Sequence, residues 1–189
     1  MSAHLLLIAH AATAAMRLGA FPRDDDPLAP EAAARLAGLR GKLRFADRCL
    51  VSPAAAAQAT AAGLGLSAVV APSLADCDYG RWRGERLAEI EPREPAAAAA
   101  WLDDPEAAPH GGESLATFLA RVGAWLDGEG RAPGVTLAIA SGAVIRAAIV
   151  AAIEAHPRVF WRLDVAPLAL AKLSGHEGRW RLTGLGPLA

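Results

Sequence analysis

Three apolar runs of this sequence end in a polar residue that could do chemistry. His10 follows the run at 4–9, Ser52 ends the run at 48–52, and Ser141 follows the run at 135–140. An imidazole can act as a nucleophile or as a general base, whereas a serine hydroxyl needs an adjacent base to become a nucleophile. These residues are therefore candidates for one site, provided that the elements ahead of them lie side by side.

The elements that must position these residues are short strands separated by helices. Runs rich in Leu, Val and Ile predict buried parallel strands at 4–9, 48–52, 67–72 and 135–140. Helix formers with proline, serine or glycine at their ends predict helices at 30–41, 52–65, 94–101, 111–130 and 141–156. The alternating tail at 168–186 predicts an antiparallel hairpin that turns between 174 and 178.

Alternation of strands with helices predicts a three-layer α/β/α sandwich with a mostly parallel central sheet and the C-terminal hairpin at its edge. The 189 residues suit a single domain over 1–189. Ligands of such sheets bind beyond the carboxyl ends of the strands. His10, Ser52 and Ser141 all lie at such ends, so we expect them to face one crevice.

Composition excludes several classes of function. The formal net charge is −1 and the 19 Lys and Arg are dispersed, which argues against nucleic acid and anionic membranes as partners. Cys49 and Cys77 form neither a disulfide framework nor a zinc motif, and the three adjacent carboxylates at 24–26 cannot all face one ion. The apolar start lacks the basic flank of a signal peptide. We therefore expect a cytoplasmic protein without metal or cofactor.

Five short motifs are spread over most of the chain. They read LIAHAAT at 7–13, SPAAAAQATA at 52–61, LADCDYGRWRG at 74–84, HGGES at 110–114 and ASGAVIR at 140–146. Together these motifs resemble the histidine phosphatase superfamily, also called the phosphoglycerate mutase-like family. The resemblance implies the nucleophile position for His10 and the proton-donor position, usually glutamate, for Asp76. Thr13 and Arg121 also stand at their family positions.

Three residues depart from the family pattern. Ala9 and Ala56 stand where the family has arginines, and Ser141 stands where it has a second histidine. In the family mechanism, a neutral histidine attacks a phosphoester while these cationic groups balance the charge on the equatorial oxygens. Losing one such donor costs about 3–4 kcal/mol of transition-state stabilisation. Because such losses are not additive, we expect phosphoryl transfer to fall by roughly 10⁴-fold or more.

The resemblance and its departures imply a degenerate member of the family. Its crevice would bind a small molecule, a phosphorylated ligand or a partner protein, through Thr13, Ser141 and Gly142. The helix that starts at Gly142 offers free backbone N–H groups and the positive end of its dipole. Alanines at 9, 11 and 54–56 would widen the crevice. The sequence predicts no oligomeric state.

The alternative is a phosphomonoester hydrolase that forms a phosphohistidine at His10, with Asp76 as proton donor. A loop arginine would then have to replace the lost clamp. Arg17, Arg23 and Arg81 adjoin the retained motifs and are the candidates, whereas Arg146 does not occupy a phosphate-ligand position of the family.

Each candidate residue also has a plain structural interpretation. His10 can be a strand-end residue with a hydrogen bond to the backbone, and Asp76 can be an exposed loop carboxylate or a helix cap. Ser141 can be the N-cap of the following helix rather than a nucleophile that uses His10 as its base. His110 precedes a helix start and can lie near the crevice or in an ordinary loop.

Overall fold

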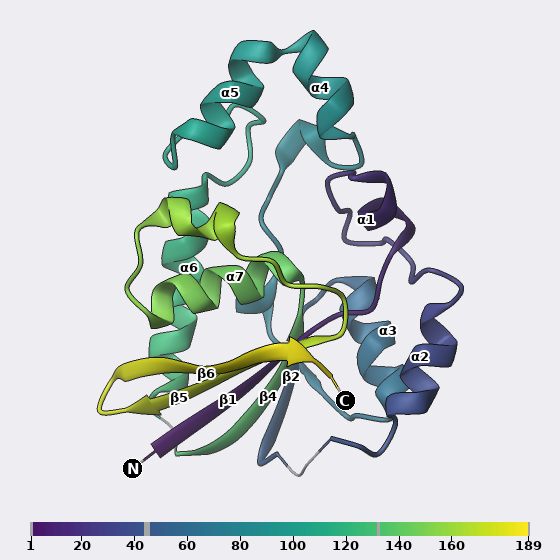
Figure 1. Ribbon diagram of the computed structural model, residues 1–189, viewed down its shortest axis with the longest axis vertical. Coiled ribbons are helices and arrows are strands. Elements are labelled where there is room, and N and C mark those ends of the chain that lie inside the picture. Colours follow the sequence, from purple (N-terminus) through teal and green to yellow (C-terminus); the bar gives the residue numbers. More distant parts are fainter. Residues whose placement is uncertain (1, 44–45, 132, 189) are drawn as a thin grey trace.

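A computed structural model describes residues 2–43, 46–131 and 133–188. Its six strands form one sheet in the order β3-β2-β4-β1-β5-β6 (Figure 1). The strands are β1 (Ser2–Ala9), β2 (Arg48–Val51), β3 (Val69–Val70), β4 (Gly134–Ala140), β5 (Ala169–His176) and β6 (Arg179–Pro187). The first four are parallel to one another, while β5 runs antiparallel to both β1 and β6. The mostly parallel sheet with an antiparallel hairpin at its edge is therefore confirmed.

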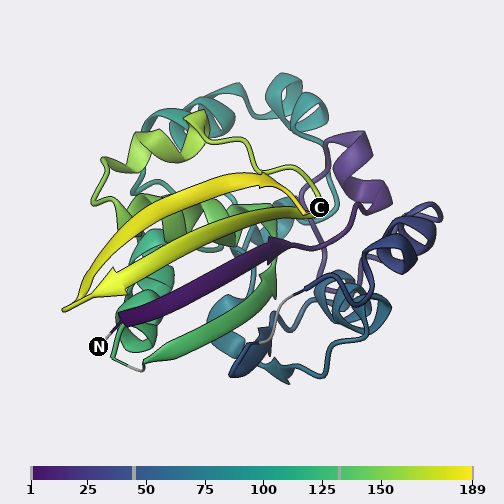
Figure 2. The same ribbon diagram turned by 60° about the horizontal axis from the view of Figure 1, so that its bottom comes forward.

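Helices cover both faces of the sheet, as Figure 2 shows. α6 (Leu115–Glu129) and α7 (Gly142–Ala152) pack on one face, and α2 (Ala32–Leu39) and α3 (Ala55–Leu64) pack on the other. Side chains of a strand alternate between faces, so Leu5 and Leu7 of β1 join the α6–α7 core while Ile8 joins the α2–α3 core. The predicted three-layer α/β/α arrangement is confirmed.

A small helical cap stands at the end of the molecule farthest from the sheet (Figure 1). It consists of α4 (Leu87–Arg93) and α5 (Pro95–Asp103), and α5 confirms the helix expected at 94–101. Trp101 of α5 packs edge-on against Phe21, Trp82 and Trp161, with ring centroids 4.7–5.9 Å apart. These aromatic contacts hold the cap onto the body of the protein.

The remaining short elements are α1 (Ala14–Leu18) and the 3₁₀ turns η1 (Pro72–Leu74), η2 (Gly80–Trp82) and η3 (Pro157–Arg162). Neither α1 nor α4 was expected, since helices of five and seven residues carry little periodic signal. No helix in the described part of the chain is both long and apolar enough to cross a membrane.

Several expected boundaries were wrong. The strand at 67–72 shrinks to Val69–Val70, an exposed two-residue edge rather than a buried strand. The helix expected from 52 begins at Ala55, because Ser52 still continues β2, its N–H donating to the Ile139 carbonyl at 2.8 Å. The helix expected to reach 156 ends at Ala152, and the chain turns at Glu154, whose φ is 51°.

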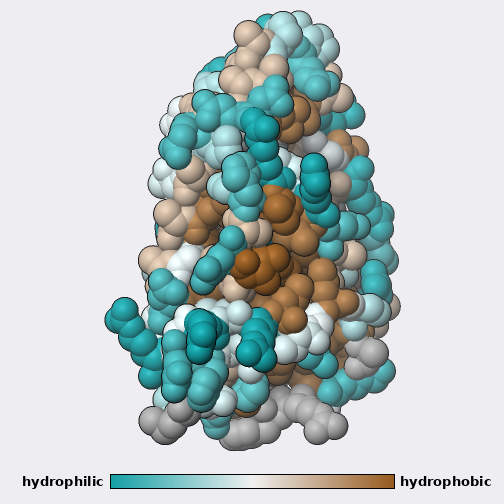
Figure 3. All heavy atoms as spheres, turned by 60° about the vertical axis from the view of Figure 1, so that its left-hand side comes forward, coloured by the Kyte–Doolittle hydropathy of each residue, from teal (hydrophilic) through white to brown (hydrophobic). Residues whose placement is uncertain are grey.

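The surface on the left of Figure 1 is hydrophobic at its centre. Figure 3 shows a group of hydrophobic side chains there, framed by hydrophilic ones.

The hairpin between β5 and β6 turns at Glu177 and Gly178, whose φ angles are 50° and 76°. This position matches the turn expected between 174 and 178.

Candidate functional site

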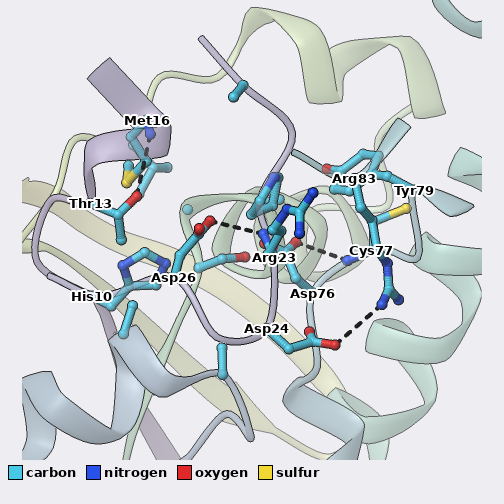
Figure 4. Close-up of a pocket in the computed structure, with 18 of the residues that line it drawn as sticks. His10, Thr13, Met16, Arg23, Asp24, Asp26, Asp76, Cys77, Tyr79 and Arg83 are labelled. Carbon is cyan, nitrogen blue, oxygen red and sulfur yellow. Dashed lines mark hydrogen bonds and ion pairs between the residues drawn. The ribbon is translucent and has the colours of Figure 1, made fainter. Parts of the chain in front are cut away.

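A cavity of about 250 Å³ opens where β1 and β4 end (Figure 4). Its buried lining residues include His10, Thr13, Ala56, Cys77, Tyr79 and Ser141, and its exposed ones include Arg23, Asp24, Arg83 and Asp164. Asp76, Gly142 and Arg146 line it as half-buried residues. The cavity therefore brings together His10, Asp76, Thr13, Ser141 and Gly142, all five of the residues to which the sequence assigned a catalytic or binding role.

His10 is fixed at the end of β1 by its backbone and by one ring nitrogen. Its N–H donates to the Ala140 carbonyl at 2.9 Å, and its side chain is only 8% exposed. Nδ1 lies 2.9 Å from the Ala11 carbonyl, an arrangement in which the neutral ring carries its proton on Nδ1. Nε2 is then the nitrogen that can accept from a ligand or attack one.

Asp76 lies in the loop between η1 and η2 and lines the same cavity. Its Oδ1 accepts from the Cys77 N–H at 2.8 Å. Burial raises the pKa of Asp76, while the Cys77 N–H, His10, the Ser141 hydroxyl and Arg146 act in the opposite direction. The Asp76 carboxyl group thus lies close enough to His10 and Ser141 for both residues to affect its pKa.

Arg121 of α6 holds the loop that carries Asp76. Its guanidinium donates to the carbonyls of Ser73, Ala75 and Asp76 at 3.0–3.3 Å and to both carboxylate oxygens of Glu113 at 2.9 Å. A planar fork with five donors suits this task, because it can serve several acceptors at once. The family-position arginine thus acts here as a fixed support for the loop.

Two glycines let the Asp76 loop approach the segment ahead of α6. A Cβ on Gly112 would lie 2.0 Å from the Asp78 carbonyl oxygen, and a Cβ on Gly80 would lie 2.2 Å from the His110 carbonyl oxygen. The two segments are joined by backbone hydrogen bonds, from Glu113 to Asp78 at 2.7 Å and from Arg81 to His110 at 3.0 Å. Only glycine permits this close approach.

Ser141 and Thr13 have structural tasks as N-caps. The Ser141 Oγ accepts from the Val144 N–H at 3.1 Å and caps α7, and the Thr13 Oγ1 accepts from the Met16 N–H at 3.3 Å and caps α1. The N-cap interpretation of Ser141 is therefore confirmed. Among the described residues, no hydrogen bond joins Ser141 to His10.

The three departures from the family pattern are not equivalent in space. Ala56 and Ser141 line the cavity with His10. Ala9 does not line it: this side chain is 1% exposed and belongs to the core beneath α7, on the same face of β1 as Leu7. The expected widening of the crevice holds for Ala54 and Ala56 alone. Ala9, Ala11 and Ala55 are not cavity residues.

Ser52 and His110 also lie outside the cavity. Ser52 is buried, and its Oγ accepts from the Ala54 N–H at 3.3 Å. His110 is 1% exposed, and its Nδ1 accepts from the Gly112 N–H at 3.0 Å. The expectation that Ser52 faces the crevice was therefore wrong, because its hydroxyl binds the Ala54 N–H, whereas Ala54 and Ala56, which follow β2, do line the cavity.

The arginines of the cavity are only partly those expected. Arg23 lines it, whereas Arg17 pairs with Glu31 and Arg81 binds the Pro109 carbonyl and Glu94. Arg83 and Arg146 line it without having been expected there. A signal for Arg146 was present in the sequence, since it follows Gly142 by four residues and a helix presents such residues on one side.

Arg83, Asp24 and Asp26 at the rim already have partners, and that of Asp26 is a backbone N–H. Arg83 pairs with Asp24 at 3.3 Å and with Asp78 at 3.0 Å. Asp26 accepts from the Arg23 N–H at 2.8 Å, as Figure 4 shows. No cluster of three or more metal-ligating side chains occurs in the parts of the chain that the structure describes.

Arg146 is different from the rim arginines. Its Cζ lies 4.2 Å from the centroid of the Phe160 ring, and burial lowers its pKa, while Tyr79, Asp76 and Asp164 act in the opposite direction. Arg146 therefore places a half-buried positive charge in the cavity wall.

Comparison with known proteins agrees with this architecture. The chain is 33% identical over 116 residues to a bifunctional protein of Mycobacterium tuberculosis, a match that covers 59% of this chain and 32% of that protein. An uncharacterized protein of Mycobacterium bovis matches equally well. The chain thus spans about a third of the length of the curated relatives it matches.

The solved structures of similar fold include two phosphatases. A mycobacterial glucosyl-3-phosphoglycerate phosphatase in complex with VO3 superimposes with a TM-score of 0.82 at 26% identity, covering 95% of this chain and 96% of that one. A phosphoserine phosphatase of Entamoeba histolytica superimposes with a TM-score of 0.87 and covers 98% of this chain and 97% of that one. Because the sequence identity is only 18%, this similarity supports the fold alone.

The sequence pattern of the histidine phosphatase superfamily (branch 1) matches residues 5–186, nearly the whole chain. The match includes the strand that ends at His10, the loop of Asp76 and the helix capped by Ser141. The overall superposition on the phosphatase structures, with TM-scores of 0.82 and 0.87, agrees with this match. The chain therefore belongs to the histidine phosphatase superfamily, branch 1.

Proposed function

We propose that this protein has lost efficient phosphatase activity and that its cavity binds a small molecule. One observation carries the proposal: Ala56 and Ser141 line the cavity beside His10, at positions where the family has an arginine and a histidine. Neither side chain can balance the charge of a phosphoryl group. A nucleophile without that balance has little means of stabilising the transition state.

The other charges of the cavity do not replace the lost clamp. Arg83 is neutralised by Asp24 and Asp78 at the rim. In its ionised form Asp76 would repel a phosphate dianion held at His10. Four aspartates and three arginines line the cavity, so its formal charge does not favour an anion such as phosphate.

Two observations favour the alternative, a phosphomonoester hydrolase. The Nε2 atom of His10 is available for attack, and the raised pKa of Asp76 suits a proton donor. Arg23 and Arg146 line the cavity and would have to supply the charge balance. The two proposals differ in whether His10 accepts a phosphoryl group.

Turnover of an aryl phosphate between pH 5 and 7.5 separates these proposals. We expect no hydrolysis that depends on His10, so wild type and His10→Ala should give the same residual rate. The Mycobacterium enzyme with glucosyl-3-phosphoglycerate phosphatase activity provides a positive control for the assay. A robust wild-type rate that His10→Ala abolishes would establish the hydrolase instead.

A further inference from the structure

Two opposite charges face the cavity without being paired. Asp76 comes from the loop after η1 and Arg146 from α7, and both line the cavity. Among the described residues, no ion pair within 4 Å involves either side chain. Asp76 accepts the Cys77 N–H on Oδ1 and interacts with the Ser141 hydroxyl, both of them neutral donors, and the stacking of Arg146 on Phe160 satisfies none of its N–H groups.

The exposed charges at the rim form no ion pair with these two groups within 4 Å among the described residues, although Asp164 lines the cavity and acts on Arg146 from a longer distance. Arg83 is bound to Asp24 and Asp78, and Arg23 lies over Gly84, where a Cβ would meet its Nε at 2.3 Å. The inner wall therefore offers one carboxyl group and one guanidinium. It also offers Nε2 of His10, an acceptor in the tautomer that donates from Nδ1 to Ala11.

Such a pair of separated, half-buried charges is costly unless each meets a counter-charge. Phosphate would satisfy Arg146 but would bring negative charge toward Asp76. A simple amine would satisfy Asp76 and leave Arg146 unpaired. A ligand that carries both an ammonium and a carboxylate group would compensate both.

We propose that the cavity takes a small zwitterion, with its ammonium group at Asp76 and His10 Nε2 and its carboxylate at Arg146. This inference rests on the proposed function, because it requires a cavity that no longer holds a phosphoryl group at His10. The cavity volume of about 250 Å³ lies below the range typical of drug-sized ligands, so it suits a molecule of amino-acid size.

Calorimetric titration with matched probes tests the proposal. Glycine, β-alanine and 4-aminobutyrate vary the distance between the two charges, and an amine and a carboxylate of the same chain length isolate each charge. We expect at least one zwitterion to bind tenfold or more tightly than its matched amine and carboxylate, and more tightly than inorganic phosphate.

Variants of Asp76 and Arg146 test which residue binds the ammonium group and which binds the carboxylate. Asp76→Asn should weaken the zwitterion about tenfold without weakening the carboxylate, and Arg146→Gln should weaken the zwitterion without weakening the amine. Asp127→Asn, the same change at an exposed carboxylate of α6 outside the cavity, is the matched control and should leave affinity within about twofold. Arg146→Lys keeps the charge if Arg146→Gln does not fold.

Absence of zwitterion binding, or binding that Asp76→Asn leaves unchanged, would overturn the inference. The aryl phosphate assay keeps this failure separate from that of the proposed function. An inactive protein that binds none of the zwitterions contradicts the ligand class alone, whereas His10-dependent turnover contradicts the proposed function itself.

Discussion

At the scale of single residues, the strongest feature is the half-buried carboxyl group of Asp76 in the cavity wall. Burial is the largest influence on its pKa, which it raises. In active phosphatases of this family such an acid serves the leaving group. Here it faces His10 without the cations that the family places around them, so its ionisation costs folding free energy that nothing nearby offsets fully.

This cost makes a prediction about stability and pH. A carboxyl group whose folded pKa is raised stabilises the fold below its unfolded pKa of about 3.9, and that contribution is lost as pH rises through the folded pKa. Asp76→Asn removes the titration, so its free energy of unfolding relative to wild type should increase from pH 4 to pH 7.

Urea unfolding at pH 4, 5.5 and 7 measures that difference. Asp25→Asn, at an exposed carboxylate, is the control and should stay within about 0.5 kcal/mol of wild type at each pH. An Asp76→Asn protein that becomes less stable than wild type toward pH 7 would show that the ionised carboxylate is favoured by the fold.

At the scale of elements, α6 positions the site through one side chain. Arg121 pairs with Glu113, which lies just before α6, and donates hydrogen bonds to three carbonyls of the loop that ends at Asp76. It is only partly exposed, which makes its hydrogen bonds stronger than those of surface pairs. It acts together with the Glu113 N–H, which donates to the Asp78 carbonyl at 2.7 Å.

Replacing Arg121 should therefore cost more than replacing an ordinary surface arginine. Arg121→Met leaves Glu113 and three carbonyls without their donor, and we expect a loss of about 2–4 kcal/mol in denaturant unfolding. Arg93→Met removes exposed pairs with Glu85 and Glu94 and should cost less than about 1 kcal/mol. Equal losses in the two variants would contradict the supporting role of Arg121.

The elements that hold the site were largely predictable from sequence, whereas the loops between them were not. Apolar runs located β1, β4 and the bodies of α6 and α7, although α6 begins at Leu115 rather than at the expected residue 111, and Ser141 marked the N-cap of α7. Arg83 and Arg146 were not predicted as cavity residues. Arg83 is directed by its pairs with Asp24, 59 residues away, and with Asp78, and Arg146 is directed by its stacking on Phe160. The spacing of Arg146 from Gly142 was a usable signal, whereas the sequence carries no signal for these tertiary partners.

At the scale of the whole molecule, the chain has the fold of the histidine phosphatase superfamily, and we propose that the charge around its histidine is changed. The sheet brings the ends of β1 and β4 together, and residues of several loops line the cavity at those ends (Figure 4). Ala9 shows why motif positions alone do not define the site, since it is buried in the core rather than facing the cavity. The loss of the clamp at Ala56 and Ser141 is the central claim.

Vanadate tests that claim most directly, because it imitates a phosphoryl group in transfer and requires both a free imidazole nitrogen and cations around it. The mycobacterial glucosyl-3-phosphoglycerate phosphatase, solved with VO3, is the positive control for soaking conditions. Crystals of this protein soaked in vanadate should show no vanadium within bonding distance of His10 Nε2. Vanadate bonded to that atom, with Arg23 or Arg146 on its oxygens, would contradict the account and establish a working phosphoryl site.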